Sequence, residues 1–164
     1  MTRKRLLTWL GGVLLVAFLL AWGIGELTYP STNPPQRYDG QILSSVSDPV
    51  LRQACFDCHS NETHHPWYRH LPLAALLIGS DISEGRENLN FSDWGQMDAE
   101  RHRKLLTKAL RELREGDMPP LQYRLLHPKA RLDTQQIAQI AQDAETVYRV
   151  QPGQVDDHDH DSHD

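Results

Sequence analysis

Two cysteines and a histidine stand close together in a chain of 164 residues that contains no other cysteine. They form the sequence Cys55-Phe56-Asp57-Cys58-His59, which matches the C-x-x-C-H pattern of covalent haem attachment. On a helical turn, residues three apart lie on one face, so both sulfurs can reach the two vinyl edges of one porphyrin. His59 then lies beside them, where it can ligate the iron. The motif therefore predicts one covalent haem c on Cys55 and Cys58, with His59 as the proximal ligand.

Other uses of the cysteine pair fit the rest of the sequence less well. A thioredoxin-like dithiol needs a βαβ context, and the sequence has no strand-like alternation of useful length. A structural zinc site needs four ligands, whereas the chain has only two cysteines. A plain Cys55–Cys58 disulfide stays open as an alternative, although it would close a loop too short to add much stability.

A candidate for the second axial position lies downstream, in Gly116-Asp117-Met118-Pro119-Pro120. The two prolines restrict this loop, and a rigid loop lowers the entropy cost of holding a thioether sulfur on iron. Met118 is therefore the predicted distal ligand. His127, just before Pro128, is the alternative, because a histidine in that loop could also reach the second face of the haem. An iron left open to water or small molecules is the third option.

Several other residues near the motif are not assigned a role at the iron. We expect four histidines to be solvated or hydrogen-bonded: His64, His65, His70 and His102. His102 is expected to lie on the polar side of its helix. Three residues soon after the motif could cover a porphyrin, pair with a propionate or simply pack in the protein: Trp67, Tyr68 and Arg69.

The N-terminus has the composition of an export segment. Three basic residues at 3–5 precede an uncharged run from Leu6 to Gly25 that is rich in Leu, Val, Ala and Phe. At a rise of 1.5 Å, about twenty helical residues cover the roughly 30 Å thickness of a bilayer core. We expect this helix to anchor the chain in the cytoplasmic membrane as a single pass, with the remainder facing the periplasm or outside. Ala21-Trp22-Gly23 offers a signal peptidase small residues, so a cleaved signal peptide is the alternative.

The part after the export segment is predicted to be all-α. Apolar residues at helical spacing, together with helix-start signals, predict four helices. The first begins at Asp48-Pro49, and the second runs from Pro72 toward Glu87. The third runs from Asp98 to Glu115, and the fourth runs from the capping box of Asp133 and Gln136 to Pro152-Gly153.

These features divide the chain into four parts. Residues 1–25 form the signal-anchor helix, and residues 26–47, with three prolines and few apolar side chains, are expected to be an extended linker. Residues 48–152 form the helical domain that carries the motif. Residues 153–164, rich in His and Asp, are expected to be a disordered tail.

The charge balance argues against a nucleic-acid partner. Of the 17 basic residues three precede Gly25, whereas all 22 acidic residues follow it. The exported part is therefore acidic overall, and a protein that binds the phosphate backbone needs clustered positive charge instead.

Three ordered blocks of the chain resemble the small bacterial haem-binding domain proteins, which share the class I cytochrome c-like arrangement. The blocks are residues 55–63 with Pro66-Trp67-Tyr68, residues 84–94, and Met118-Pro119-Pro120 through Tyr123, Leu126, His127 and Pro128. The resemblance implies an exported helical domain with one covalent haem, His59 as proximal ligand and a loop at Met118. The chain departs from the usual family pattern at His64 and His65, where an apolar residue and a tryptophan are usual.

These observations favour a haem protein that transfers single electrons between redox partner proteins outside the cytoplasmic membrane, rather than an enzyme. Methionine ligation would favour ferrous haem and raise the reduction potential relative to two histidines. A haem-based sensor or peroxidase-like protein with an open or labile distal site is the alternative. A membrane-tethered interaction module with a Cys55–Cys58 disulfide and no haem is a third hypothesis.

Overall fold

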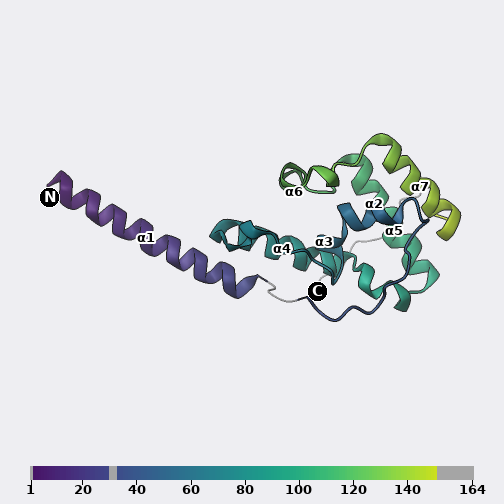
Figure 1. The fold of residues 1–164 in the computed structure, drawn as a ribbon, viewed down its shortest axis with the longest axis horizontal. Helices are drawn as coiled ribbons and strands as arrows, with labels where there is room; N and C mark the ends of the chain where they lie inside the picture. Colours follow the sequence, from purple (N-terminus) through teal and green to yellow (C-terminus); the bar gives the residue numbers. More distant parts are fainter. Residues whose placement is uncertain (1, 30–32, 151–164) are drawn as a thin grey trace, which may run out of the picture.

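The computed structural model describes residues 2–29 and 33–150, and within this part every regular element is helical (Figure 1). The predicted all-α class is confirmed, as is the long apolar helix at the N-terminus. The predicted tail at 153–164 lies outside the described residues.

The N-terminal helix α1 (Arg3–Thr28) extends away from the domain, and its apolar side chains from Leu6 to Leu20 are exposed (Figure 1). It contains one stretch that is long and apolar enough to cross a membrane by length and composition. The helix continues three residues beyond Gly25, where the uncharged run ends.

The domain consists of short helical segments joined by brief loops. In chain order they are α2 (Asp48–Ala54), α3 (Phe56–His59), the 3-10 helix η1 (Trp67–His70), α4 (Pro72–Asn88), the 3-10 helix η2 (Phe91–Gln96), α5 (Ala99–Glu115), α6 (Leu121–Leu126), the 3-10 helix η3 (Pro128–Ala130) and α7 (Thr134–Tyr148). All four predicted helices are present, and the predicted capping box of Asp133 and Gln136 closes the start of α7.

The last helix ends earlier than predicted. The sequence placed its end at Pro152-Gly153, which lies outside the described residues, but α7 stops at Tyr148. Arg149 adopts the left-handed conformation with φ 57°, and the Val150 N–H then donates to the Ala144 carbonyl at 3.4 Å. The chain turns at Arg149, and the next side chain, Val150, is buried in the main core.

The main core lies between α5, α7 and the segment that carries the cysteines. Four leucines of α5 pack with two small or branched side chains of α7: Leu105, Leu106, Leu110, Leu113, Ile140 and Ala144. Phe56, inside the C-x-x-C-H motif, stacks on Phe91 with ring centroids 5.0 Å apart. The motif is therefore part of the core rather than a surface loop.

The C-terminal part of the predicted linker also belongs to the packed domain. Residues 33–41 are without helix, as expected, but Ile42 and Leu43 are buried in the main core. The Ile42 N–H donates to Asp48 Oδ1 at 2.6 Å, and the Tyr148 hydroxyl donates to the Ile42 carbonyl at 2.8 Å. The packing of the domain thus begins before residue 48, because two apolar residues among polar ones suffice to fix an extended segment.

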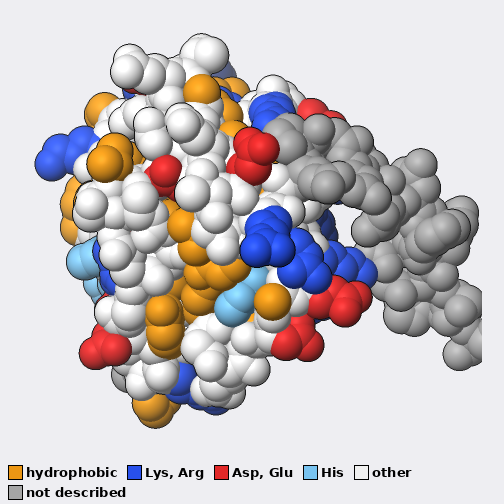
Figure 2. Space-filling model, turned by 90° about the vertical axis from the view of Figure 1, so that its right-hand side faces the viewer, with side chains coloured by type: hydrophobic (Ala, Val, Ile, Leu, Met, Phe, Trp, Pro, Cys, Tyr) orange, Lys and Arg blue, Asp and Glu red, His pale blue; other side chains and the backbone are white. Residues whose placement is uncertain are grey.

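The side of the molecule on which α7 lies in Figure 1 presents a mixed surface. Figure 2 shows a narrow strip of hydrophobic side chains there, with basic and acidic side chains next to one another beside it. This face therefore carries both signs of charge in close proximity.

Asp143 on α7 links that helix to the loop before α2, and its replacement by asparagine is expected to destabilise the fold at neutral pH. The buried carboxylate accepts hydrogen bonds from the Ser44 hydroxyl and the Gln139 amide. Burial alone would raise the pKa of Asp143, but the hydrogen bonds that it accepts outweigh burial and lower the pKa. The charged form is thus favoured in the folded state, so Asp143→Asn should cost about 1–3 kcal/mol in the free energy of unfolding at pH 7.

This cost should shrink as the pH falls through the lowered pKa of Asp143, below the ordinary aspartate pKa of about 3.9, because the wild-type carboxylate is then protonated too. Urea unfolding of both proteins at several pH values measures this difference. A difference that stayed constant down to the acid end would contradict the assignment.

Candidate functional site

The two cysteines and the histidine lie on one helical turn at the junction of α2 and α3. Cys55 separates the two helices, and the N–H groups of Cys58 and His59 both donate to its carbonyl, at 3.2 and 2.9 Å. Both cysteines are half-buried free thiols. Burial raises the pKa of each thiol to about 12. A dithiol oxidoreductase instead lowers the pKa of its attacking cysteine, so these surroundings do not suit that chemistry.

The imidazole of His59 is fixed through one ring nitrogen. Nδ1 lies 2.9 Å from the Gly85 carbonyl oxygen and 3.0 Å from that of Leu89. Since a carbonyl can only accept, Nδ1 carries the proton and the lone pair of a neutral ring lies on Nε2. Burial lowers the pKa of His59, although the two backbone hydrogen bonds act in the opposite direction, so the neutral ring is favoured. A metal-ligating histidine is typically held in this way, with its second nitrogen on a backbone carbonyl.

Gly85 makes this arrangement possible. It is buried in α4, and a Cβ atom at this position would lie 2.6 Å from the backbone oxygen of Cys58 and 3.2 Å from the Cys58 Cβ. Only a residue without a side chain allows α4 to cross α3 so closely that its carbonyl reaches His59. In the sequence, Gly85 only weakened the helix prediction, and its role at the motif could not be seen.

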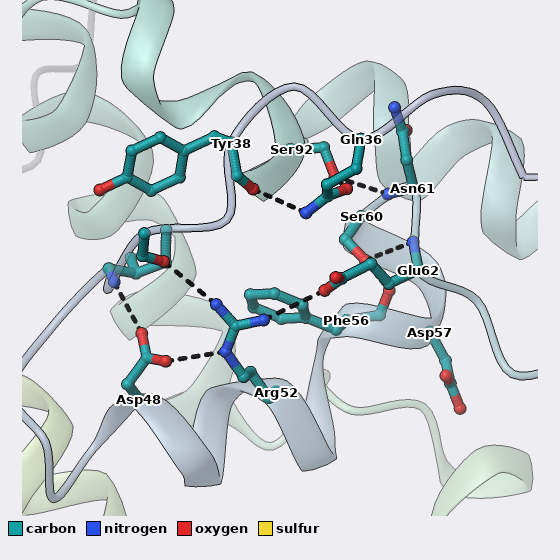
Figure 3. A network of polar contacts seen from close by, with 12 residues as sticks. Gln36, Tyr38, Asp48, Arg52, Phe56, Asp57, Ser60, Asn61, Glu62 and Ser92 are labelled. Carbon is teal, nitrogen blue, oxygen red and sulfur yellow. Dashed lines mark hydrogen bonds and ion pairs between the residues drawn. The ribbon is translucent and has the colours of Figure 1, made fainter.

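Arg52 binds residues on several segments around the motif, as Figure 3 shows. Its guanidinium donates from Nε to Asp48 Oδ2 at 2.8 Å, from Nη1 to Glu62 Oε2 at 3.1 Å, and from Nη2 to the Gly40 carbonyl at 3.1 Å. The same group lies 4.6 Å above the ring centroid of Phe56. Residues before, within and after the motif are thereby joined through one side chain. Sequence reasoning missed it, although Asp48 and Arg52 have the i, i+4 spacing of a helical ion pair.

Replacing Arg52 by methionine is expected to lower the free energy of unfolding by about 1–3 kcal/mol, because the buried Asp48 loses its charged donor. The partial exposure of Arg52 keeps this value below that of a fully buried pair. The matched control is Arg37→Met, which removes the more exposed pair with Asp93 and should cost less than about 1 kcal/mol. Denaturant unfolding measures both, and equal losses would mean that the Arg52 contacts add nothing beyond a surface pair.

The segment after the motif is fixed by a second set of hydrogen bonds, part of which Figure 3 shows. The Asn61 N–H donates to the Ser92 hydroxyl at 2.8 Å. Arg86 of α4 donates to the Ser60 carbonyl at 2.8 Å and to the Thr63 hydroxyl at 3.0 Å. Two of the sequence blocks that resemble the haem-binding family, one around the motif and one from α4 into η2, are thus in direct contact.

Comparison with known proteins bears on this arrangement. A family model described as a haem-binding domain matches residues 28–146, which is most of the chain. The chain belongs to this haem-binding domain family. The resemblance to haem-binding domain proteins that was inferred from the sequence blocks is confirmed, whereas the class I cytochrome c-like arrangement stays a prediction. Comparisons with curated proteins and with solved structures found no match.

The haem-binding domain places the predicted distal ligand, Met118, near the surface. Met118 follows Gly116, which ends α5 in the left-handed conformation with φ 83°, and its side chain is 38 % exposed. The loop is held at both ends, because the Met118 N–H donates to the Glu112 carbonyl at 3.2 Å and Arg124 donates to the Gly116 carbonyl at 3.1 Å.

His127, the alternative ligand, is connected to the motif through Tyr123. Its ring stacks on Tyr123 at 4.0 Å, and its Nδ1 lies 3.1 Å from the Tyr123 carbonyl oxygen. The Tyr123 hydroxyl donates to Asp57 Oδ2 at 2.7 Å, inside the C-x-x-C-H sequence. His127 Nε2 lies 3.4 Å from the Tyr68 hydroxyl. By the same reasoning as for His59, Nδ1 of His127 donates, so its lone pair lies on Nε2.

The short helix α6 presents an apolar surface beside the motif. Three of its side chains are exposed leucines: Leu121, Leu125 and Leu126. The bond between Tyr123 and Asp57 fixes this helix next to the cysteine turn. Exposed apolar side chains on a helix that is bonded to the motif fit the chemistry of a porphyrin, which is itself mostly apolar.

Among the described residues, the four other histidines are hydrogen-bonded, as predicted. His64 pairs with Asp57 at 3.1 Å, His65 with the Tyr29 hydroxyl at 2.8 Å, and His70 with Glu26 at 3.1 Å. His102 is the exception in position, because it does not lie on a polar helix face. It bonds to the Trp94 carbonyl at 2.9 Å and stacks on the indole ring with centroids 4.2 Å apart.

Proposed function

We propose that this haem-binding domain carries one covalent haem c, with thioether bonds from Cys55 and Cys58 and His59 Nε2 as the proximal iron ligand. The observation that carries the proposal is the pair of hydrogen bonds from His59 Nδ1 to backbone carbonyls, which leaves Nε2 with a lone pair. The two free thiols on the same helical turn supply the second requirement. Haem c, when bound, supplies a one-electron couple between ferric and ferrous iron.

The proposed role is one-electron transfer between redox partner proteins on the outer side of the cytoplasmic membrane. Two features support this location. The helix α1 is long and apolar enough to span a bilayer, and the basic residues at its start match the cytoplasmic flank of such a span. Burial of the motif in the core would lower the dielectric around the iron, which tunes the potential of a haem.

For the distal position we propose Met118, with His127 as the second candidate. Met118 is favoured by the loop that Arg124 and the end of α5 hold in place. His127 is favoured by the lone pair on Nε2, whose contact within the described part of the chain is the long one to the Tyr68 hydroxyl. An open or labile distal site would instead support a sensor or peroxidase-like protein.

The first test is production of the full chain with a cytochrome c maturation system. A denatured chain that keeps the mass of one haem and gives a c-type pyridine haemochrome spectrum is the expected result. A colourless chain, or haem that separates from the denatured chain, would refute covalent attachment.

The second test assigns the distal ligand. In Met118→Ala we expect loss of the sulfur-to-iron charge-transfer band of the ferric protein, whereas the matched variant His127→Ala should keep it. Carbon monoxide should bind the ferrous Met118→Ala protein faster than the wild type. The opposite pattern would assign the site to His127, and fast binding by the wild type would assign an open site.

A further inference from the structure

The transmembrane candidate α1 is packed against the domain at its C-terminal end. Tyr29, which caps α1, forms a small buried cluster with Ala75 and Ile82 of α4. The Arg69 guanidinium lies 5.3 Å above the Tyr29 ring centroid, and the Tyr29 hydroxyl is 2.8 Å from His65 Nδ1. The start of α4 therefore lies alongside the last turns of α1, as Figure 1 shows.

One hydrogen bond between α1 and η1 indicates the level of the domain relative to a membrane that α1 would span. Glu26 is the first charged residue after the uncharged run from Leu6 to Gly25, so in a spanning helix it marks the outer edge of the hydrocarbon core. Its Oε1 lies 3.1 Å from Nδ1 of His70, the last residue of η1. The end of η1 and the beginning of α4 are thus at the level of that edge.

Large apolar side chains are exposed at this level. Trp67 in η1 is 81 % exposed, and Leu73 in the first turn of α4 is 70 % exposed, while Leu71 and Leu77 are also exposed. Leu73 and Leu77 are four residues apart and share one helix face, opposite the face of Ala75 and Ile82 that packs on α1. In water, such a group of side chains would be unfavourably hydrated.

The chemistry of this group matches a bilayer interface. Tryptophan gathers at the headgroup level of membranes, where its ring is apolar and its N–H remains wet. Trp22, one turn before Glu26 on α1, is another exposed tryptophan, about 6 Å along the helix from that edge. We propose that η1 and the first turns of α4 lie on the outer surface of the bilayer that α1 spans, with Trp67, Leu71, Leu73 and Leu77 in the interfacial region. The proposal rests on the membrane anchoring proposed above.

This contact would fix the orientation of the domain on the membrane. The packing of α4 on α1 and the insertion of Leu73 and Leu77 are two attachments on opposite faces of one helix. A domain held in this way cannot rotate freely about α1, so the motif, which α4 contacts through Gly85, would keep one direction relative to the membrane plane.

The test uses the full chain in phospholipid nanodiscs with a photoreactive residue, p-benzoylphenylalanine, at one position at a time. Position 73, in place of Leu73, probes the proposed surface. Position 147, in place of the similarly apolar and exposed Val147 on α7, is the matched control, and position 14, in place of Leu14 inside α1, reports the span itself. Irradiation followed by intact mass measurement detects covalent phospholipid adducts, and circular dichroism checks that each variant keeps its helix content.

Lipid adducts at positions 73 and 14, with none at 147, are the expected result. Adducts at 14 but not at 73 would overturn the surface proposal and leave the anchor intact. Absence of adducts at both positions would overturn the anchor as well. A crosslink from position 73 to a second copy of the chain or to a porphyrin, instead of lipid, would assign this surface to self-association or to the haem and overturn the proposal.

Discussion

Replacing Gly85 by alanine is expected to destabilise the domain and to disturb His59, the proposed proximal ligand, although alanine is the better helix former. In an isolated helix the change would gain about 1 kcal/mol. Here the new Cβ would lie 2.6 Å from the Cys58 oxygen and 3.1 Å from its carbonyl carbon, and these backbone atoms cannot rotate away. Overpacking of this kind costs about 1–3 kcal/mol, sometimes more, so after the gain in helix propensity we expect a net loss of about 1–2 kcal/mol.

The same shift should reach the site, because the Gly85 carbonyl accepts from His59 Nδ1. If α4 moves away from α3, the imidazole loses its orientation, and we expect less haem per chain after maturation. Denaturant unfolding and the haem-to-protein ratio measure the two effects. The matched control is Ser83→Ala on the exposed side of the same helix, which should be neutral or slightly stabilising. A Gly85→Ala protein as stable and as fully loaded as the wild type would mean that the close approach of the two helices is not required.

The contrast between Gly85 and the cysteine motif shows what the sequence could predict. Cys55, Cys58 and His59 are neighbours in the chain, and their mutual geometry follows from one helical turn. Gly85 acts on them from far along the chain, and its effect depends on a helix crossing that local patterns do not encode. The helices themselves were predictable, because periodic leucines and capping residues are local signals.

The segment before α2 shows a second limit of prediction. Prolines correctly indicated a segment without helix, but an extended segment has no periodicity that reveals which residues are buried. Ile42 and Leu43 enter the core because Asp48 and Tyr148 bind the backbone of Ile42. The contacts of Arg52 could not be predicted for a similar reason, since two of its partners, Glu62 and Gly40, lie outside its helix.

Close packing and proposed chemistry meet at the same residues. Phe56 belongs to the main core, and Leu89 packs against it. Phe56 is also part of the helical turn that carries His59, and the Leu89 carbonyl accepts from the His59 ring. If His59 ligates the iron as proposed, a change that loosens the core should also alter the ligand-field spectrum of the haem before the domain unfolds. This coupling would give the proposed haem site a rigid side at His59, which orients a ligand without further loss of entropy.

The largest effects are expected at the motif, where different substitutions test the proposed covalent attachment and the proposed iron ligation separately. Changing both Cys55 and Cys58 to serine should leave His59 able to ligate but abolish the thioether bonds. The denatured chain should then carry no haem mass, and any haem retained by the native protein should give a b-type pyridine haemochrome spectrum.

In His59→Ala the cysteines remain, and the haem that is attached should lose its proximal nitrogen. Because the ring removed was fixed by the carbonyls of Gly85 and Leu89, the space that it leaves is bounded by backbone acceptors. Added imidazole has the same donor and lone pair, so we expect it to restore the spectrum of the six-coordinate protein. His64→Ala is the control, since this exposed histidine pairs only with Asp57 among its described contacts and should change neither property. An unaltered spectrum in His59→Ala would mean that another residue is the proximal ligand. An altered spectrum that added imidazole restores would assign this role to the imidazole of His59.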